Sequence, residues 1–158
     1  MSPLEVLSKW AVTNIARVSP LDVVSEWPVP AVAAAAVGPS GVLAQYGDVD
    51  RRFALASVTK PLVARAAQVA IEEGVVELDT PAGPPGSTVR HLLAHASGLS
   101  MRTGEVQAEP GKRRIYSNYG FGVLAESVQR GSDIEFTEYL RQAVFEPLKM
   151  STDRKSVV

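Results

Sequence analysis

A serine and a lysine three residues apart are the first residues in this sequence that could carry out chemistry together. Ser57 and Lys60 stand in the segment ASVTKP, which opens the most apolar helical run of the chain. Three residues along a helix advance a side chain by about 4.5 Å and turn it by about 60°, so the two are neighbours. A lysine near the positive end of a helix is electrostatically unfavourable unless it can lose its proton. A neutral amine can take the proton of a serine hydroxyl, so the pair predicts Ser57 as nucleophile and Lys60 as its base.

The same spacing has a structural interpretation. Ser57 can be a helix cap and Lys60 a surface residue whose charge reaches water. Ser-x-x-Lys is short enough to arise by chance, and on the motif alone this interpretation is the commoner outcome. The catalytic interpretation gains support from apolar residues at helical spacing from Lys60, since burial disfavours its charge. These neighbours are Val63, Ala64 and Ala67.

A second cluster of polar residues lies in Tyr116-Ser117-Asn118, just before a predicted helix. Tyr116 can shuttle a proton if nearby cationic charge lowers its pKa from about 10. Asn118 can hold a substrate amide or carbonyl group and can hydrogen-bond Lys60. The alternative is that Asn118 caps the helix and Tyr116 packs on it.

The histidines at positions 91 and 95 have the spacing of a zinc-binding pair on a helix. No Glu or Cys is placed to complete such a site, and zinc needs three or four ligands. We therefore expect no metal ion at this pair, and the chemistry of Ser57 and Lys60 implies no organic cofactor.

Composition limits the class of protein. The chain has 158 residues, 46% of them hydrophobic, with a net charge of −1 and no cysteine. It can build one core, and its charge gives no reason to expect nucleic acid or a membrane as partner. No apolar stretch approaches the length of about 20 residues that a membrane span needs, and the N-terminus lacks the pattern of a signal peptide. We expect a cytoplasmic protein, whose oligomeric state the sequence leaves open.

Periodicity predicts strands first and helices afterwards, which is typical of the α+β class. An amphipathic helix is expected over residues 4–18 and a hairpin around residues 38–41, with a third short strand in RRFALA. A helix is expected from Ser57 to Glu73. Glycines are expected to close the helices, at Gly74, Gly98 and Gly131. Ser132 and Glu135 are expected to form the capping box of the last helix, whose core face is Phe136, Leu140 and Val144.

Four segments occur in the order found in one known family: FALASVTKPLVA, VRHLLAHASGL, PGKRRIYSNYGFGVLAESV and FEPLKM. The chain thereby resembles the serine β-lactamases and penicillin-binding proteins from about residue 29 to residue 150. The Tyr-x-Asn form is similar to the branch of class C β-lactamases, D-alanyl-D-alanine peptidases and esterases. The resemblance implies an antiparallel sheet flanked by helices plus a helical region. It also implies Ser57 as nucleophile, Lys60 as base, Tyr116 as proton shuttle, and Asn118 as ligand of substrate and lysine.

The sequence departs from the family after Tyr116, where no Lys-Thr-Gly or His-x-Gly motif follows. The expected fold is therefore truncated before the C-terminal strands. We expect residues 1–56 to hold the N-terminal helix and first strands, and residues 57–150 the nucleophile helix and helical region. Residues 153–158, DRKSVV, match the translation of a common sequencing adapter and are expected to be a non-native tail.

The function that these patterns predict is a serine hydrolase forming an acyl-enzyme on an amide or ester, either a small molecule or peptide-like. It is expected to be of the esterase, D-amino-acid peptidase or β-lactamase type, with this chain an incomplete, inactive fragment. The alternative is a non-catalytic pseudoenzyme that binds a ligand in the same cleft.

Overall fold

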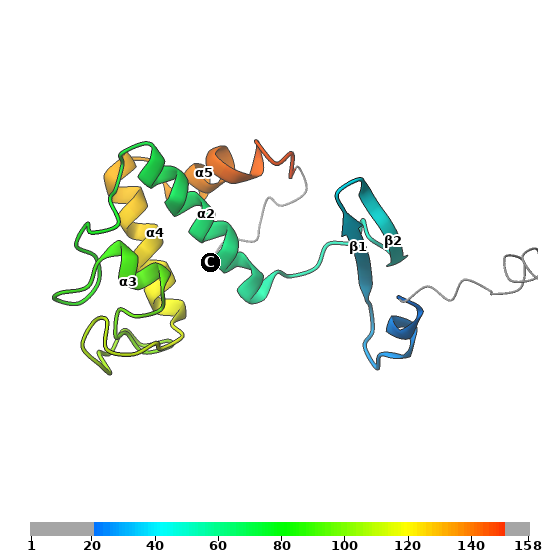
Figure 1. The fold of residues 1–158 in the computed structure, drawn as a ribbon, viewed down its shortest axis with the longest axis horizontal. Helices are drawn as coiled ribbons and strands as arrows, with labels where there is room; N and C mark the ends of the chain where they lie inside the picture. The colour runs from blue at the N-terminus through cyan, green and yellow to red at the C-terminus, as the bar shows by residue number, and fades with distance from the viewer. Residues whose placement is uncertain (1–20, 151–158) are drawn as a thin grey trace, which may run out of the picture. The chain divides into compact units, whose positions relative to one another are not determined.

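A computed structural model describes residues 21–150 of the chain. The chain divides into two compact units, Met1–Phe53 and Ala54–Val158, which are described separately (Figure 1). The helix predicted over residues 4–18 and the tail predicted over residues 153–158 lie outside the described residues. No helix in the described part is long and apolar enough to cross a membrane.

The first unit contains the predicted hairpin, which is confirmed. After a 3-10 helix, η1 (Asp22–Glu26), strand β1 (Ala33–Gly38) pairs antiparallel with β2 (Gly41–Gly47). Gly41 has a φ of 114°, a conformation that L side chains rarely adopt, so glycine suits this turn.

The third strand predicted in RRFALA is wrong. Residues 52–55 have no regular secondary structure, and within residues 21–150 β1 and β2 form a sheet of two strands. A strand needs a neighbour to pair its backbone groups, and this segment has none.

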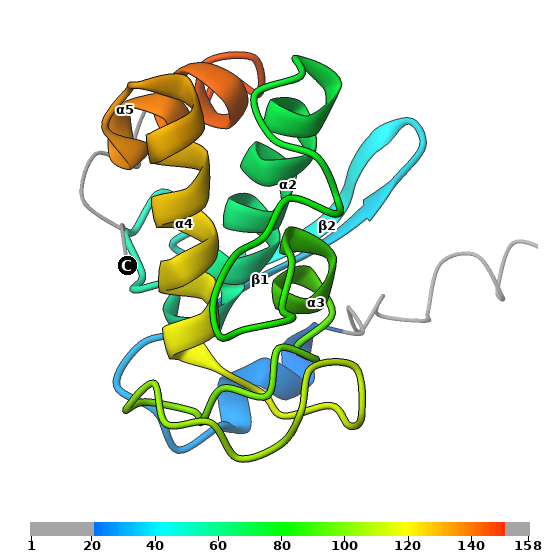
Figure 2. The same ribbon diagram turned by 90° about the vertical axis from the view of Figure 1, so that its left-hand side faces the viewer.

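The second unit is a helical cluster built around two long helices, α2 (Thr59–Glu72) and α4 (Asn118–Ser132). Figure 2 shows α4 lying along α2, with α3 (Val89–Leu93) and α5 (Phe136–Leu140) packed against α4. A π-helical turn, η3 (Arg141–Phe145), continues α5 and contacts α2. The side chains that meet between these helices are almost fully buried, among them Val63, Ala67, Leu92, Leu124, Val128, Leu140 and Val144. The predicted core face of Phe136, Leu140 and Val144 is confirmed.

The ends of the helices follow the prediction only in part. Gly74, with a φ of 74°, follows the last turn of α2 as predicted. The helix α3 ends earlier than expected, because the left-handed residue directly after its end is His95, while Gly98, also at a positive φ, comes three residues later. Gly98 lies in the following loop, where a Cβ would collide with the carbonyl oxygen of Ala108.

The end of α4 differs in the same way. Asp133 takes the left-handed conformation there, and Gly131 lies inside the last turn. A Cβ on Gly131 would come within 2.6 Å of the carbonyl oxygen of Val75, so glycine permits close packing at this position. The predicted capping box is also wrong, because Glu135 is itself the N-cap of α5 and accepts the N–H of Glu138. Ser132 instead donates its hydroxyl to the carbonyl of Val128.

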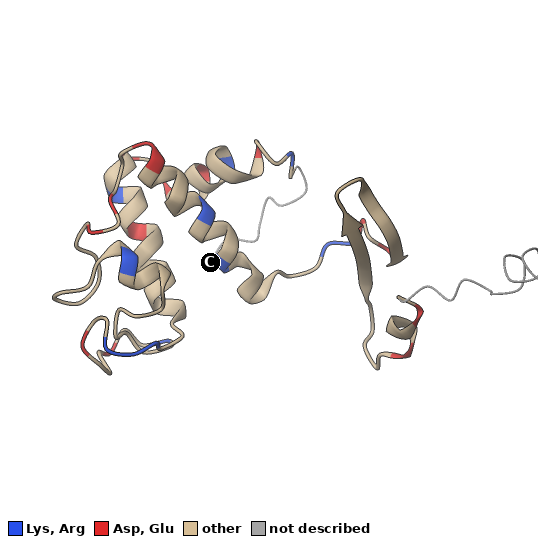
Figure 3. Cartoon of the chain, in the orientation of Figure 1, with Lys and Arg blue, Asp and Glu red and all other residues tan. Residues whose placement is uncertain are grey.

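Charged side chains of both signs are interspersed along the helices (Figure 3). The run Lys112-Arg113-Arg114 lies in the loop that leads to Tyr116.

Candidate active site

Ser57 and Lys60 are neighbours at the start of α2, as the spacing predicts. Ser57 lies in a short 3-10 turn, η2 (Ala56–Val58), that runs directly into α2. The Nζ atom of Lys60 is 3.3 Å from the Oγ atom of Ser57. No side-chain hydrogen bond caps η2 or α2, so the structure does not use Ser57 as a helix cap. Its exposed hydroxyl is left for chemistry.

The backbone immediately before Ser57 is strained. Ala56 has a φ of 46°, in the left-handed region that is costly for residues with a Cβ. Such strain persists where the surrounding structure imposes it, and it is found often at functional sites. The strained turn presents Ser57 at the beginning of the helix, where backbone N–H groups have no intrahelical partner.

Tyr116 completes the contacts of Ser57. Its hydroxyl donates a hydrogen bond to Ser57 Oγ at 2.6 Å, although the two residues are 59 positions apart. The Lys60 side chain, acting as a hydrogen-bonding cation, and then the Ser57 hydroxyl lower the pKa of the Tyr116 phenol below its ordinary value of 10. A lowered pKa brings the phenol closer to the working pH, which a group that shuttles protons requires.

The surroundings of Lys60 combine apolar side chains and aromatic rings. Val63 and Ala67 are buried beside it, as the sequence indicates, but Lys60 itself is only half-buried. Its Nζ lies 4.6 Å from the centre of the Tyr116 ring and 5.9 Å from that of Phe121. Phe121 is a buried residue of α4, and its contact with Lys60 depends on how α4 packs against α2.

Asn118 is the first residue of α4 and its side chain is exposed. No hydrogen bond between the described residues joins this side chain to Lys60, so the predicted lysine contact is not formed here. Ser117, not Asn118, caps the helix: its hydroxyl accepts the N–H of Gly120 at 2.8 Å. The amide of Asn118, two residues after Tyr116, is therefore left available.

The two histidines have different partners. The Nδ1 atom of His91 accepts the N–H of Thr88 at 3.2 Å and so caps α3. The Nδ1 atom of His95 accepts the N–H of Ser117 at 3.1 Å, and its ring contacts the rings of Tyr116 and Phe121. Within residues 21–150 no three His, Cys, Asp or Glu side chains form a group that could hold a metal ion. Sequence reasoning missed the contacts of His95, because they join residues that are far apart in the chain.

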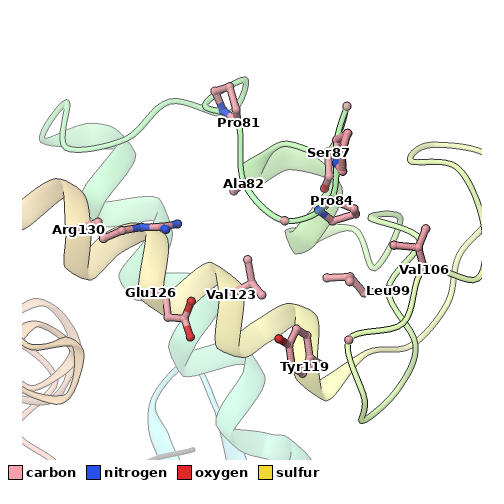
Figure 4. Close-up of a pocket in the computed structure, with 14 residues that line it drawn as sticks. Pro81, Ala82, Pro84, Ser87, Leu99, Val106, Tyr119, Val123, Glu126 and Arg130 are labelled. Atoms are coloured by element: carbon pink, nitrogen blue, oxygen red, sulfur yellow. The ribbon is translucent and has the colours of Figure 1, made fainter.

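A separate pocket of about 650 Å³ lies beside another face of α4 (Figure 4). Tyr119, Val123, Glu126 and Arg130 line it from the helix, and the loop of residues 81–87 lines the opposite side. None of the four predicted site residues lines this pocket.

Comparison with known proteins places the chain in a family. The family model described as Beta-lactamase matches residues 27–153, most of the chain. The chain belongs to this family, whose members are serine hydrolases. The resemblance seen in the sequence is thereby confirmed.

Among solved structures, a beta-lactamase from Mycobacterium bovis is 72% identical, with a TM-score of 0.83 over 85% of this chain and 49% of that chain. A D-amino acid amidase from Ochrobactrum anthropi SV3, complexed with L-phenylalanine amide, is 26% identical, with a TM-score of 0.52 over 60% of this chain and 37% of that chain. These likenesses confirm the predicted β-lactamase/transpeptidase-like fold.

A curated relative, penicillin-binding protein 4* of Bacillus subtilis (strain 168), is 27% identical over 65% of this chain and 30% of its own length. An uncharacterized protein of Alkalihalophilus pseudofirmus is 30% identical over 63% of this chain and 33% of its own length. The chain therefore spans about a third of the curated relatives it matches and about half of the Mycobacterium bovis protein.

Proposed function

We propose that this chain carries the nucleophile, the general base and the proton shuttle of a serine hydrolase that forms an acyl-enzyme on an amide or ester. The observation that supports this most is the convergence of two proton-transfer groups on one exposed hydroxyl. Lys60 Nζ and Tyr116 OH lie 3.3 Å and 2.6 Å from Ser57 Oγ. The Tyr116 distance is within hydrogen-bond reach for proton transfer, and the Lys60 distance lies at its upper edge, as is common without a bound substrate.

In the acylation step, Lys60 acts in its unprotonated form: Ser57 Oγ attacks the carbonyl carbon of the substrate while its proton passes to the neutral amine of Lys60. The carbonyl oxygen becomes an oxyanion, which N–H groups at the start of the helix stabilise. Tyr116 then donates its hydroxyl proton to the leaving amine or alcohol as the bond to the carbonyl carbon breaks. Lys60 returns a proton to the Tyr116 phenolate, and the acyl group remains on Ser57.

In the deacylation step, a water molecule attacks the acyl-enzyme and transfers a proton through the same pair of groups. The acid product leaves and the Ser57 hydroxyl is restored. Asn118 holds the carbonyl or amide of the substrate beside Ser57, because it lies two residues after Tyr116 and its exposed side chain has no hydrogen-bond partner within residues 21–150. The L-phenylalanine amide bound to the D-amino acid amidase of Ochrobactrum anthropi SV3 supports an amide as one class of substrate.

Covalent labelling tests the proposal. The 158-residue chain and an extended protein are treated with a fluorophosphonate and with a labelled penicillin. In the extended protein, this chain through Met150 is joined to the remaining C-terminal half of the Mycobacterium bovis protein. Intact-mass spectrometry should show one adduct on the extended protein that disappears in Ser57→Ala. The matched control is Ser40→Ala, which removes another exposed serine, in the hairpin turn, and should leave the adduct unchanged.

An adduct that survives in Ser57→Ala would contradict the proposal. Reversible binding of penicillin without any adduct would instead support the non-catalytic alternative.

A further inference from the structure

We infer that His95 is a positioning residue that fixes Tyr116 against Ser57 and Lys60. This inference rests on the proposed function, because it assigns a role in the same site. His95 does not touch the Ser57 hydroxyl; it acts through the loop that carries the tyrosine.

His95 holds the backbone on both sides of Tyr116. Its carbonyl oxygen accepts the N–H of Ile115 at 2.8 Å, and its ring Nδ1 accepts the N–H of Ser117 at 3.1 Å. One residue thus binds the residue before Tyr116 and the residue after it. The left-handed backbone of His95, with a φ of 57°, turns the chain at the end of α3 so that both acceptors face this loop.

The imidazole ring of His95 also supports the rings of the site. Its centre lies 4.7 Å from that of Tyr116 and 4.8 Å from that of Phe121. Both rings in turn contact Lys60 Nζ. His95 is 7% exposed, so its ring is held in place by these neighbours. The same ring therefore fixes the direction of the Tyr116 side chain, whose backbone it already holds.

The hydrogen bond from Ser117 defines the protonation state of His95. An N–H can donate to Nδ1 only if Nδ1 carries no proton, so the neutral ring carries its proton on Nε2. Burial first, and then the positive charges of Arg114 and Lys60, lower the pKa of His95 below 6.5. The surroundings thus favour the form that accepts the hydrogen bond.

Three variants separate the two contacts of the His95 side chain. His95→Asn keeps a side-chain acceptor and tolerates the left-handed backbone, but it loses the ring. His95→Phe keeps a ring and loses the acceptor. His95→Ala loses both. The matched control is His91→Asn, because His91 also accepts a backbone N–H through Nδ1 and lies four residues before His95, in α3, which it caps.

The first readout is the ionisation of Tyr116 in the 158-residue chain, measured by ultraviolet absorption as the pH is raised. The spectrum of Tyr116→Phe is subtracted, so that the difference reports Tyr116 alone. In His95→Ala and His95→Phe, Tyr116 should ionise at higher pH than in the wild type, because its ring moves away from Lys60, which lowers its pKa. His91→Asn should not change it. The second readout is the amide resonance of Ser117, which should show scalar coupling to His95 Nδ1 in the wild type.

The third readout is acylation of the extended protein. His95→Ala should lower kcat by about 100-fold with little change in KM, which is the effect expected when a reacting group is misplaced by about 1 Å. His95→Asn should recover part of that loss. The inference is overturned if a folded His95→Ala protein ionises Tyr116 and acylates as the wild type does. If the wild type forms no acyl-enzyme, the proposed function fails, while the Tyr116 ionisation and the Ser117 coupling still decide the role of His95.

Discussion

Replacing Lys60 by arginine separates its role as a base from its role as a cation. The two residues carry the same charge, but a guanidinium does not lose its proton in proteins. An arginine at position 60 would keep a cation near the rings that Lys60 Nζ contacts at 4.6 Å and 5.9 Å. Lys60→Met removes the charge and the base together. If the amine 3.3 Å from Ser57 Oγ takes the serine proton, both variants lose general base catalysis.

General base catalysis contributes about 10²- to 10⁴-fold in rate, or about 2.7–5.4 kcal/mol of barrier. We therefore expect the second-order rate constant for acylation of the extended protein to fall by this factor in both variants. Stopped-flow mixing with a chromogenic ester or penicillin measures it. The pKa of Tyr116 should stay low in Lys60→Arg, which keeps the cation, and rise in Lys60→Met. Acylation within tenfold of the wild type in Lys60→Arg would refute the assignment and make the Tyr116 phenolate the base.

Further predictions concern the tyrosine, the fold and pH. Tyr116→Phe removes the hydroxyl that lies 2.6 Å from Ser57 Oγ and should slow acylation by about 10²-fold or more, while the urea unfolding transition stays within about 1 kcal/mol. Gly98→Ala should lower the free energy of unfolding by more than Gly86→Ala, because both glycines have positive φ but only Gly98 faces a backbone carbonyl. Urea titrations measure the free energy of unfolding of both variants. An equal decrease in the two would show that the contact with Ala108 is unimportant. The lowered pKa of His95 predicts that stability falls as pH drops below 6.5, since the unfolded chain binds the proton first. The loss of stability below pH 6.5 should be smaller in His95→Asn. If the loss is as large as in the wild type, groups other than His95 cause it.

The features of the site that could be predicted from sequence are those that depend on local geometry. Ser57 and Lys60 are three residues apart on one helical turn, so their contact follows from helix geometry alone. Tyr116 joins them from a distant segment, and only the family resemblance indicates its place in the site. The contacts of His95 depend on the packing of α3 against the start of α4, which no periodic pattern in the sequence reveals.

The glycines explain the errors at the helix ends. Rules for helix termini assign the left-handed position to glycine, so the sequence predicts that Gly98 and Gly131 close α3 and α4. The structure places His95 and Asp133 in those conformations. The two glycines instead lie where carbonyl oxygens of Ala108 and Val75 approach too closely for a Cβ. A glycine required for close packing has the same appearance in a sequence as one required by a turn.

The two-stranded sheet leads to a prediction about the activity of the 158-residue chain. Among the described residues it has two strands, and apolar side chains on them are exposed, including Val37 at 71% and Leu43 at 68%. Two-stranded sheets are marginal in water without further packing. We therefore expect ester turnover by this chain alone to stay near background and to rise in the extended protein.

The most direct test of the catalytic role of Ser57 is peptide mapping of the acylated extended protein. After a brief reaction with labelled penicillin and an acid quench, the adduct should map to the peptide that contains ASVTKP, with the added mass on Ser57. The same treatment of Ser57→Ala should give no adduct. An adduct on any other residue, or undiminished turnover in Ser57→Ala, would contradict the account.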